Sequence, residues 1–335
     1  MSSKDIKAKA MELGYTACGI IPVASFDEYI RELDERSLLF PKSKKHYDRY
    51  REFASLPEDG KSIIVCTQRY TNYSIPEDVA KFYGKMYLFD NRIDYTQEHR
   101  TNTEFEKYMQ MLGLGIIEKM VPDRWAGARA GVGKFGYNNF LFDEKHGSYI
   151  RIKTWVVDKE LEYDPDPESI QLKACSENCL KCVEACPTGA MTGKFKMDAG
   201  KCACRVQFDE EDALNDDMKG KLGLWIYGCD ACQDACPMNK NKFNENDEYP
   251  LLKEFENLMK PEDILAMDEE TYKRDLNQRF WYSGEEHLWL WKCNALRSMI
   301  NSGDDKYHAL IKKYCSYKDD RVSATAKWGC EKLGI

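Results

Sequence analysis

The feature that most constrains this chain is the clustering of its cysteines. Nine of the fourteen cysteines in its 335 residues lie between Cys175 and Cys236, and the other five are scattered singly. A secreted disulfide scaffold would be short and would spread its cysteines evenly. The clustering therefore predicts a metal centre in a reducing compartment, and we expect a cytoplasmic location.

Two segments repeat the same cysteine spacing. Each contains C-x2-C-x3-C-P, which ends once at Cys186 and once at Cys236. This is the spacing of bacterial-type [4Fe–4S] ligands, in which the cysteine before the proline binds the other cluster of the pair. Two [4Fe–4S] clusters are therefore predicted. The first takes Cys175, Cys179, Cys182 and Cys236, and the second takes Cys186, Cys202, Cys229 and Cys232.

Three points stay open in this assignment. Cys204 is the alternative to Cys202 as the eighth ligand, because both lie in MDAGKCACR between the two motifs. The gap between Cys175 and Cys179 has three residues instead of two, so Cys175 departs from the usual spacing. A pair of structural zinc sites, which also use C-x2-C pairs, is the competing interpretation of the whole pattern.

Apolar periodicity and turn residues divide the chain into three predicted domains. A mixed α/β domain covers 1–165, a double-cluster domain 166–245 and a helical domain 246–335. The helical tail contains helix pairs separated by SGDD and KDD, a pattern typical of HEAT-type repeats. In the first domain we expect helices at 4–13 and 100–113, strands at 16–21, 62–68 and 149–158, and a linker at 161–169.

Charge and hydropathy bear on the possible partners, although net charge alone does not exclude RNA. The net charge of −8 argues against a general nucleic-acid binder, although the basic run Lys42–Arg51 could be a phosphate-binding patch as well as a solvated surface. No apolar run approaches the ~20 residues that a bilayer span needs. The first residues lack the apolar core of a signal peptide. We therefore expect no membrane partner.

A glycine-rich loop at 128–139 is the second informative motif. Its segment GVGKFG matches G-x-G-x-x-G, but a dinucleotide site requires a helix directly after the loop. The following segment YNNFLF reads as extended, so we expect either a close backbone approach to a ligand or a simple turn.

The order of these segments is familiar. SIIVCTQRY (62–70), FDNRIDYTQEHRTNTEFEKYMQMLG (89–113), AGVGKFGYNNFLF, the doubled cysteine motif and YGCDACQDACP (227–237) together resemble the epoxyqueuosine reductase family. The likeness covers most of the chain, and a more distant one extends to the reductive dehalogenases.

This resemblance implies an α+β protein. It would have a nitroreductase-like cobalamin-binding α/β domain, a two-cluster bacterial ferredoxin-like domain and a C-terminal HEAT-like α-helical repeat. The implied cofactors are two [4Fe–4S] clusters and a base-off cobalamin. A low-potential electron donor such as a ferredoxin or flavodoxin would supply the electrons. The family's corrinoid contacts fall here on Arg51, Met86, Gly136, Asn139, Ile150 and Arg205. Surface salt bridges for the arginines, and core packing for Met86 and Ile150, are the alternatives.

The sequence departs from the family at the proton donor. The family has an aspartate about fourteen residues before the glycine loop, in V-D-x-x-P, and that position here is Ile117. Glu118 and Asp123 are the candidate replacements, each of which could also be an exposed carboxylate. Tyr95 is a third candidate, which could instead only pack.

The leading hypothesis is therefore a cobalamin-dependent iron–sulfur reductase. It would pass electrons through two [4Fe–4S] clusters to a base-off corrinoid and reduce an organic substrate, either epoxyqueuosine in tRNA or a related compound. The alternatives are a two-cluster electron-transfer protein and a corrinoid-reducing partner without its own substrate.

Overall fold

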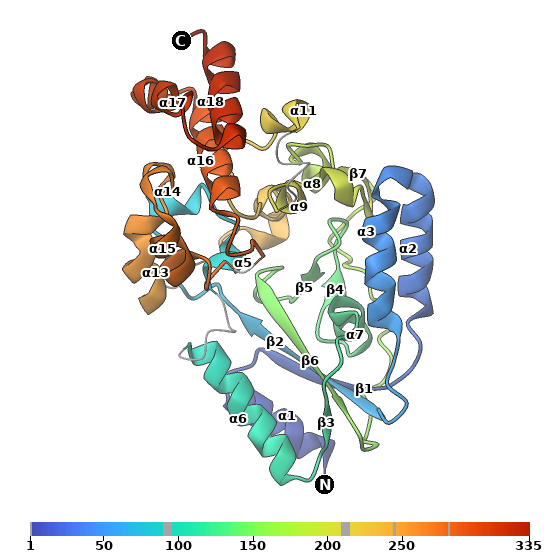
Figure 1. Cartoon of the computed structure of the whole chain (residues 1–335). Coiled ribbons are helices and arrows are strands. Elements are labelled where there is room, and N and C mark those ends of the chain that lie inside the picture. Colours follow the sequence, from blue (N-terminus) through green and yellow to red (C-terminus); the bar gives the residue numbers. More distant parts are fainter. Residues whose placement is uncertain (1, 90–95, 209–214, 244–245, 281) are drawn as a thin grey trace.

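The computed structural model describes residues 2–89, 96–208, 215–243, 246–280 and 282–335. Its central element is a four-stranded antiparallel sheet in the order β1-β2-β6-β3 (Figure 1). In the register of the sheet, Cys18 faces Cys66 and Ile64 faces Trp155. The strands are β1 (Ala17–Pro22), β2 (Ser62–Arg69), β6 (Ile150–Val157) and β3 (Ile116–Ile117).

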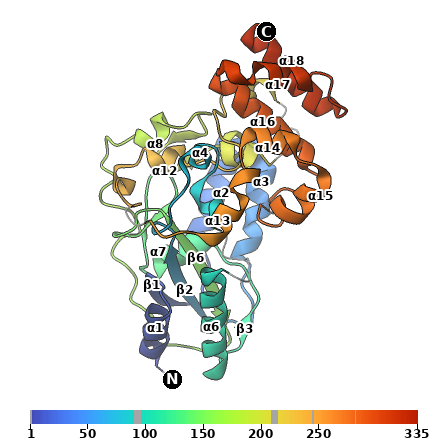
Figure 2. The ribbon, with the colours of Figure 1, turned by 90° about the vertical axis from the view of Figure 1, so that its left-hand side faces the viewer.

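Helices cover both faces of this sheet. Because successive side chains of a strand point to opposite faces, Ile64 and Ile63 enter different cores. Ile64 packs with α1 (Ser3–Glu12) and α6 (Gln97–Met111), which lie side by side in Figure 2, whereas Ile63 packs towards α7 (Asp123–Arg129). Burial of both faces explains why the centre of β2, Ile63–Cys66, is a continuous apolar run.

The described elements confirm the sequence expectations for the first domain. The helices and strands expected at 4–13, 16–21, 62–68, 100–113 and 149–158 are all present, with ends shifted by at most three residues. The segment after the glycine loop is extended, as expected, and forms a hairpin of β4 (Lys134–Phe135) and β5 (Leu141–Phe142). The α+β class is also confirmed.

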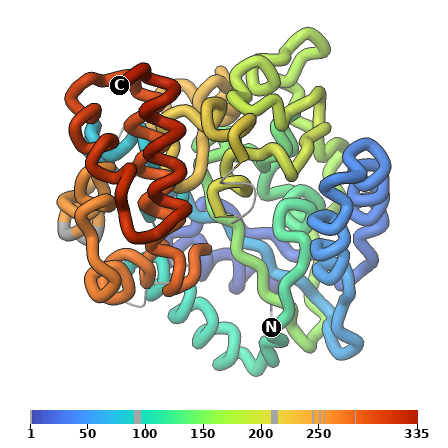
Figure 3. Tube along the Cα trace, turned by 45° about the horizontal axis from the view of Figure 1, so that its top comes forward, coloured from blue at the N-terminus to red at the C-terminus, as the bar shows by residue number. Residues whose placement is uncertain are grey.

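A layer of mostly short helices and strands lies beside the sheet and carries the nine clustered cysteines. The helical pair α2 and α3, blue in Figure 3, packs against the hairpin of β7 and β8, where Met197 contacts Leu33 and Tyr47. These elements are α2 (Asp27–Leu39), η1 (Pro41–Ser43), α3 (Lys44–Tyr50), η2 (Arg51–Ala54), α8 (Lys181–Glu184), β7 (Met191–Gly193), β8 (Lys196–Met197), η3 (Ala199–Lys201), α9 (Ala203–Val206), α11 (Asp216–Lys219), α12 (Ala231–Asp234) and η4 (Pro237–Asn239).

The C-terminal part is helical. Its long helix α16 (Leu288–Ser302) is followed by α17 and α18, and the sequence turns SGDD and KDD separate them as expected. The other elements are α4 (Glu77–Ala80), α5 (Lys85–Leu88), α13 (Pro250–Phe255), η5 (Glu256–Leu258), α14 (Pro261–Ala266), α15 (Glu269–Thr271), η6 (Tyr272–Leu276), η7 (Asp305–Tyr307), α17 (His308–Tyr314) and α18 (Asp320–Leu333).

The core of this helical part also includes an early segment of the chain. Tyr83, Leu88 and Phe89 pack with Trp291 and its neighbours on α16, and the hydroxyl of Tyr83 donates to the carbonyl of Met259 at 2.7 Å. Packing therefore crosses the predicted division at 165, and the three domain boundaries stay predictions. Among the described residues, no helix is both long and apolar enough to cross a bilayer.

Candidate functional site

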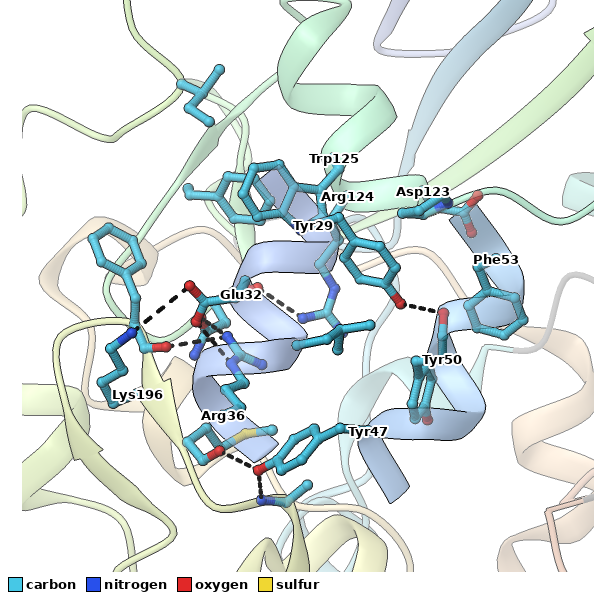
Figure 4. Close-up of a pocket in the computed structure, with 18 of the residues that line it drawn as sticks. Tyr29, Glu32, Arg36, Tyr47, Tyr50, Phe53, Asp123, Arg124, Trp125 and Lys196 are labelled. Atoms are coloured by element: carbon cyan, nitrogen blue, oxygen red, sulfur yellow. Dashed lines mark hydrogen bonds and ion pairs between the residues drawn. The ribbon is translucent and has the colours of Figure 1, made fainter. Parts of the chain in front are cut away.

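A large cavity with a volume of about 470 Å³ lies between the α2–α3 pair, α7 and the β7–β8 hairpin. Figure 4 shows side chains from these elements pointing into it. Its walls combine aromatic rings with charged groups. The lining includes Tyr29, Glu32, Arg36, His46, Tyr47, Tyr50, Phe53, Asp123, Arg124, Trp125, Phe135, Asn139, Lys194, Phe195, Lys196, Met197 and Ala199.

A chain of hydrogen bonds forms one wall of this cavity (Figure 4). The guanidinium of Arg36 donates to Glu32 Oε1 at 2.8 Å and to Asn139 Oδ1 at 2.7 Å. Arg124 Nη1 donates to the carbonyl of Asn139 at 2.8 Å. Because an arginine only donates, the contact with Arg36 fixes Oδ1 of Asn139 and directs its Nδ2 elsewhere. That Nδ2 is buried and has no hydrogen-bond partner.

An unpartnered buried amide costs free energy unless a ligand accepts from it. Asn139 has a left-handed backbone, with φ of 65°, so its side chain is held at this place in the turn. Two guanidiniums, those of Arg36 and Arg124, also lie on this wall. Desolvation by the surrounding protein atoms lowers the pKa of Arg124, and the nearby charge of Arg36 acts in the same direction. The wall is therefore rich in donors and positive in charge.

Asp123 lies at the first turn of α7 on the same cavity. Its Oδ1 accepts a hydrogen bond of 2.7 Å from the hydroxyl of Thr154. The side chain is exposed where it lines the cavity. Protein atoms packed around the carboxyl partly desolvate it and raise the pKa of Asp123, against the opposing effects of Thr154, Lys153 and Arg124. A carboxyl of this kind can hold a proton and release it to a bound ligand.

The basic run Lys42–Arg51 is more than a solvated surface. Its outer residues form salt bridges, including Lys44 to Asp48 at 2.6 Å, whereas His46, Tyr47 and Tyr50 line the cavity. Burial lowers the pKa of His46 to about 4, and the nearby charges of Arg205 and Arg49 act in the same direction. This histidine is therefore neutral at physiological pH.

The structure places the cysteines in two groups. In the first, one small cavity is lined by Cys175, Cys179, Cys182 and Cys236, which come from both motifs. Burial raises the pKa of the Cys182 thiol, and the thiols of the other three add to this effect. Backbone amides of Met238 and Asn239 donate to the sulfur of Cys236.

The second group contains Cys186, Cys202, Cys229 and Cys232. Burial raises the pKa of the Cys232 thiol well above its usual value, and the thiols of Cys229, Cys202 and Cys186 contribute. The cysteine that ends each motif thus lies with the other motif, as the spacing predicts.

Cys202 and Cys204 differ in their surroundings. The sulfur of Cys202 accepts hydrogen bonds from the backbone amides of Cys204 and Arg205, an arrangement suited to a thiolate. The sulfur of Cys204 instead contacts the hydroxyl of Tyr87 at 2.8 Å. These surroundings favour Cys202 as the eighth ligand, although Cys204 is also close to this group.

The second cysteine group is adjacent to the large cavity. Ala199, which lines the cavity, accepts hydrogen bonds from the amide of Cys202 at 3.2 Å and from Arg205 Nε at 3.0 Å. One turn of chain therefore separates the cysteine group from the space where a ligand can bind.

Of the six residues predicted to contact a corrinoid, Asn139 lines the cavity and Arg205 supports its wall. Arg51 instead pairs with Asp34 and Asp48, which is the surface salt bridge expected as the alternative to a corrinoid contact. The carbonyl of Met86 accepts a hydrogen bond from Arg151. The side chain of Met86 packs on the helical core. Ile150, at the start of β6, is 7% exposed.

The candidate proton donors and Gly136 also differ in whether they lie at the cavity. Both carboxylates are exposed, but Asp123 lines the cavity and Glu118 does not. Tyr95 lies outside the described residues. Gly136 is needed by the protein itself, since a Cβ there would come within 2.5 Å of the ring of Phe142. The glycine loop thus packs closely on its own hairpin.

Arg36 and Arg124 belong to the site but were not predicted from the sequence. Arg124 directly follows the candidate Asp123, and this adjacency is the one sequence feature that could have indicated Arg124 as a site residue. Arg36 lies in an ordinary amphipathic helix, α2, where nothing in the pattern distinguishes it.

Comparisons with known proteins agree with the geometry. The family model described as a 4Fe-4S double cluster binding domain matches residues 174–239, which include every cysteine of both groups. The match confirms the predicted pair of [4Fe–4S] clusters. It leaves the assignment of individual ligands open.

Similar proteins are named epoxyqueuosine reductase. The one from Leadbetterella byssophila is 28% identical over 71% of this chain and 80% of its own length. The one from Prochlorococcus marinus is 26% identical over 87% of this chain and 95% of its own length. These comparisons confirm the resemblance to the epoxyqueuosine reductases.

Solved structures establish the fold. Epoxyqueuosine reductase from Bacillus subtilis, in a form whose catalytic aspartate loop is swung out of the active site, matches with a TM-score of 0.77 and 19% identity. The match covers 99% of this chain and 90% of that one. An epoxyqueuosine reductase with an epoxyqueuosine-modified tRNA stem loop matches over the same shares, with a TM-score of 0.76 and 19% identity.

Proposed function

We propose that this relative of the epoxyqueuosine reductases is a cytoplasmic, cobalamin-dependent iron–sulfur reductase. Its substrate would be epoxyqueuosine in tRNA or a related compound. The observation that carries the proposal is the large cavity beside the second cysteine group, because a reductase needs an electron source next to the space that holds its substrate. A ferredoxin or flavodoxin would supply the electrons.

The cysteine groups would hold the clusters as the spacing predicts, with Cys202 as the eighth ligand. The corrinoid is larger than this cavity and would insert only one edge into it, where Asn139 offers an unsatisfied donor and Ala199 leads to the second cysteine group. When bound, these cofactors supply electrons at low potential to the substrate. The protein then has to position the ligands, exclude water and deliver protons.

Asp123 is our candidate for the proton donor. Desolvation raises its pKa, which favours the protonated form, and its place on the cavity wall puts it near a bound ligand. It would stand in for the family aspartate whose position here is Ile117. Arg124 and Arg36 would stabilise negative charge that develops on the ligand during reduction.

The proposal is tested on anaerobically purified and reconstituted protein. We expect about eight irons per chain, retention of one hydroxocobalamin with a base-off spectrum, and turnover of epoxyqueuosine tRNA with a low-potential reductant. Iron without retained corrinoid would favour the electron-transfer protein. Corrinoid reduction without turnover would favour the corrinoid-reducing partner, and zinc in place of iron would reject the proposal.

A further inference from the structure

Two of the five scattered cysteines are brought together near the C-terminus. Cys315 directly follows α17, and Cys330 lies in the last turns of α18. Their sulfur atoms are 3.4 Å apart. Both thiols are half-buried, so they remain accessible to small molecules. Fifteen residues of sequence separate the two positions, so the contact is created by the fold of the helical hairpin.

The hairpin holds this contact through bonds of its own. The hydroxyl of Ser323, in the first turns of α18, donates to the carbonyl of Cys315 at 2.7 Å. Asp319 caps α18 by accepting from the amides of Arg321 and Val322. The end of α17 is thus tied to the start of α18, and the two sulfurs face each other across a defined turn.

We propose that Cys315 and Cys330 form a reversible intramolecular disulfide that staples α17 to α18. A disulfide bond is about 2.05 Å long, so side-chain rotation and a small shift of the helices would close the gap. The hairpin is the last part of the chain in Figure 1, far along the sequence from the cysteines of both cluster groups. This modification site is independent of the proposed reductase activity.

The chemistry is a thiol–disulfide exchange with a low-molecular-weight disulfide such as oxidised glutathione. One cysteine thiolate attacks the small disulfide, which breaks its S–S bond and releases one small thiol. The second cysteine then attacks the mixed disulfide and releases the other small thiol. Two protein thiols are oxidised, one small disulfide is reduced to two thiols, and the protons balance. Burial and the adjacent thiol of Cys315 raise the pKa of Cys330, and Lys312 opposes this shift, so the exchange proceeds faster at alkaline pH.

The staple would stiffen the support of the cluster region. Lys332 of α18 donates to Asn301 Oδ1 of α16 at 2.7 Å. Asn301 in turn donates to the carbonyls of Lys219 at 2.8 Å and Gly223 at 3.1 Å. These carbonyls belong to the loop that leads to Cys229. A cross-link between α17 and α18 would therefore hold Lys332 in place, and through Asn301 it would support the segment before Cys229.

The test uses the anaerobic holoprotein with oxidised glutathione, followed by blocking of free thiols and peptide mass spectrometry. We expect a cross-linked peptide pair containing Cys315 and Cys330, which a reductant such as dithiothreitol separates again. We also expect oxidation to raise the melting temperature by a few degrees, because the cross-link restricts the unfolded chain. Cys330→Ser should lose both effects and keep the iron content.

Cys18 and Cys66 provide a matched control within the same sample. They face each other on β1 and β2, but Cys66 is 0% exposed, and we expect both to stay reduced. Recovery of Cys315 and Cys330 as blocked free thiols, or as separate glutathione adducts, under conditions that oxidise exposed thiols would overturn the proposal. Because this mapping uses the unmodified sequence, it tests the proposal even if Cys330→Ser does not fold.

Discussion

The hydroxyl of Thr154 donates a hydrogen bond of 2.7 Å to Oδ1 of Asp123. This bond links β6 of the central sheet to the first turn of α7, at the wall of the cavity. It favours the ionised carboxylate, whereas burial favours the protonated acid, and burial prevails. The sheet therefore adjusts the acidity of the group that we propose as the proton donor.

Replacing the carboxyl should remove most of the activity. We expect Asp123→Asn to lower kcat by about 10²-fold or more, the usual contribution of a positioned acid, while cluster content and corrinoid retention stay unchanged. Single-turnover assays measure this loss. Glu118→Gln, which alters an exposed carboxylate outside the cavity lining, serves as the control and should keep wild-type kcat. Full activity of Asp123→Asn would exclude Asp123 as the donor.

Thr154→Val should change the pH profile instead of abolishing activity. Removing the hydroxyl removes a contact that lowers the pKa of Asp123, so this pKa should rise further. Since the proposed reaction needs the protonated acid, the alkaline limb of kcat should move to higher pH. A profile of kcat against pH that covers the whole alkaline limb of both proteins tests this. An unchanged or acid-shifted alkaline limb would contradict the role given to this pair.

The grouping of the cysteines predicts which cluster each variant loses. Cys186→Ser should remove the cluster of the second motif, although Cys186 lies in the first motif, and about four irons should remain. Cys236→Ser should damage the other cluster. Iron analysis and electron paramagnetic resonance of each reduced variant distinguish the two. Cys293→Ser, at a buried position on α16 away from both groups, is the control. Loss of the same cluster signal in both variants would refute the exchange of ligands.

Asn139→Asp should weaken corrinoid binding. Aspartate keeps the acceptor oxygen for Arg36 and tolerates the left-handed backbone, but it lacks the Nδ2 donor. We expect a rise in Kd for hydroxocobalamin of about tenfold, the equivalent of one net hydrogen bond, measured by spectral titration. Arg51→Ala is the control, since Arg51 pairs with Asp34 and Asp48, and its Kd should not change. Equal affinity of Asn139→Asp and wild type would remove Asn139 from the corrinoid site.

His46 should make the protein sensitive to acid. Its pKa is about 4 in the folded chain and about 6.5 when unfolded. The unfolded state therefore binds the proton first as pH falls, and stability is lost between about pH 6.5 and pH 4. Melting temperatures of His46→Gln should fall by a few degrees less over this interval than those of wild type. Parallel curves for the two proteins would contradict this assignment.

The sequence predicted what depends on local pattern. Two-residue alternation located β6, continuous apolar residues located β2, and the spacing before Pro187 and Pro237 predicted how the cysteines would divide. It did not predict the place of Arg36, because a cavity wall is built from elements distant in the chain. It also could not distinguish Arg51, which faces two carboxylates, from an arginine that faces a ligand, since that depends on the rotation of a short helical turn.

The shared core of 70–89 and the C-terminal helices has a practical consequence. Tyr83 and Phe89 have almost no solvent exposure, and part of their cover comes from rings after residue 245. Tyr83 packs against Phe280 and Trp291, and Phe89 against Tyr249. A gene truncated at the predicted boundary would leave these rings facing water and would yield aggregated polypeptide. Dissection into modules is therefore a poor route to studying either half, and purification should begin from the intact chain.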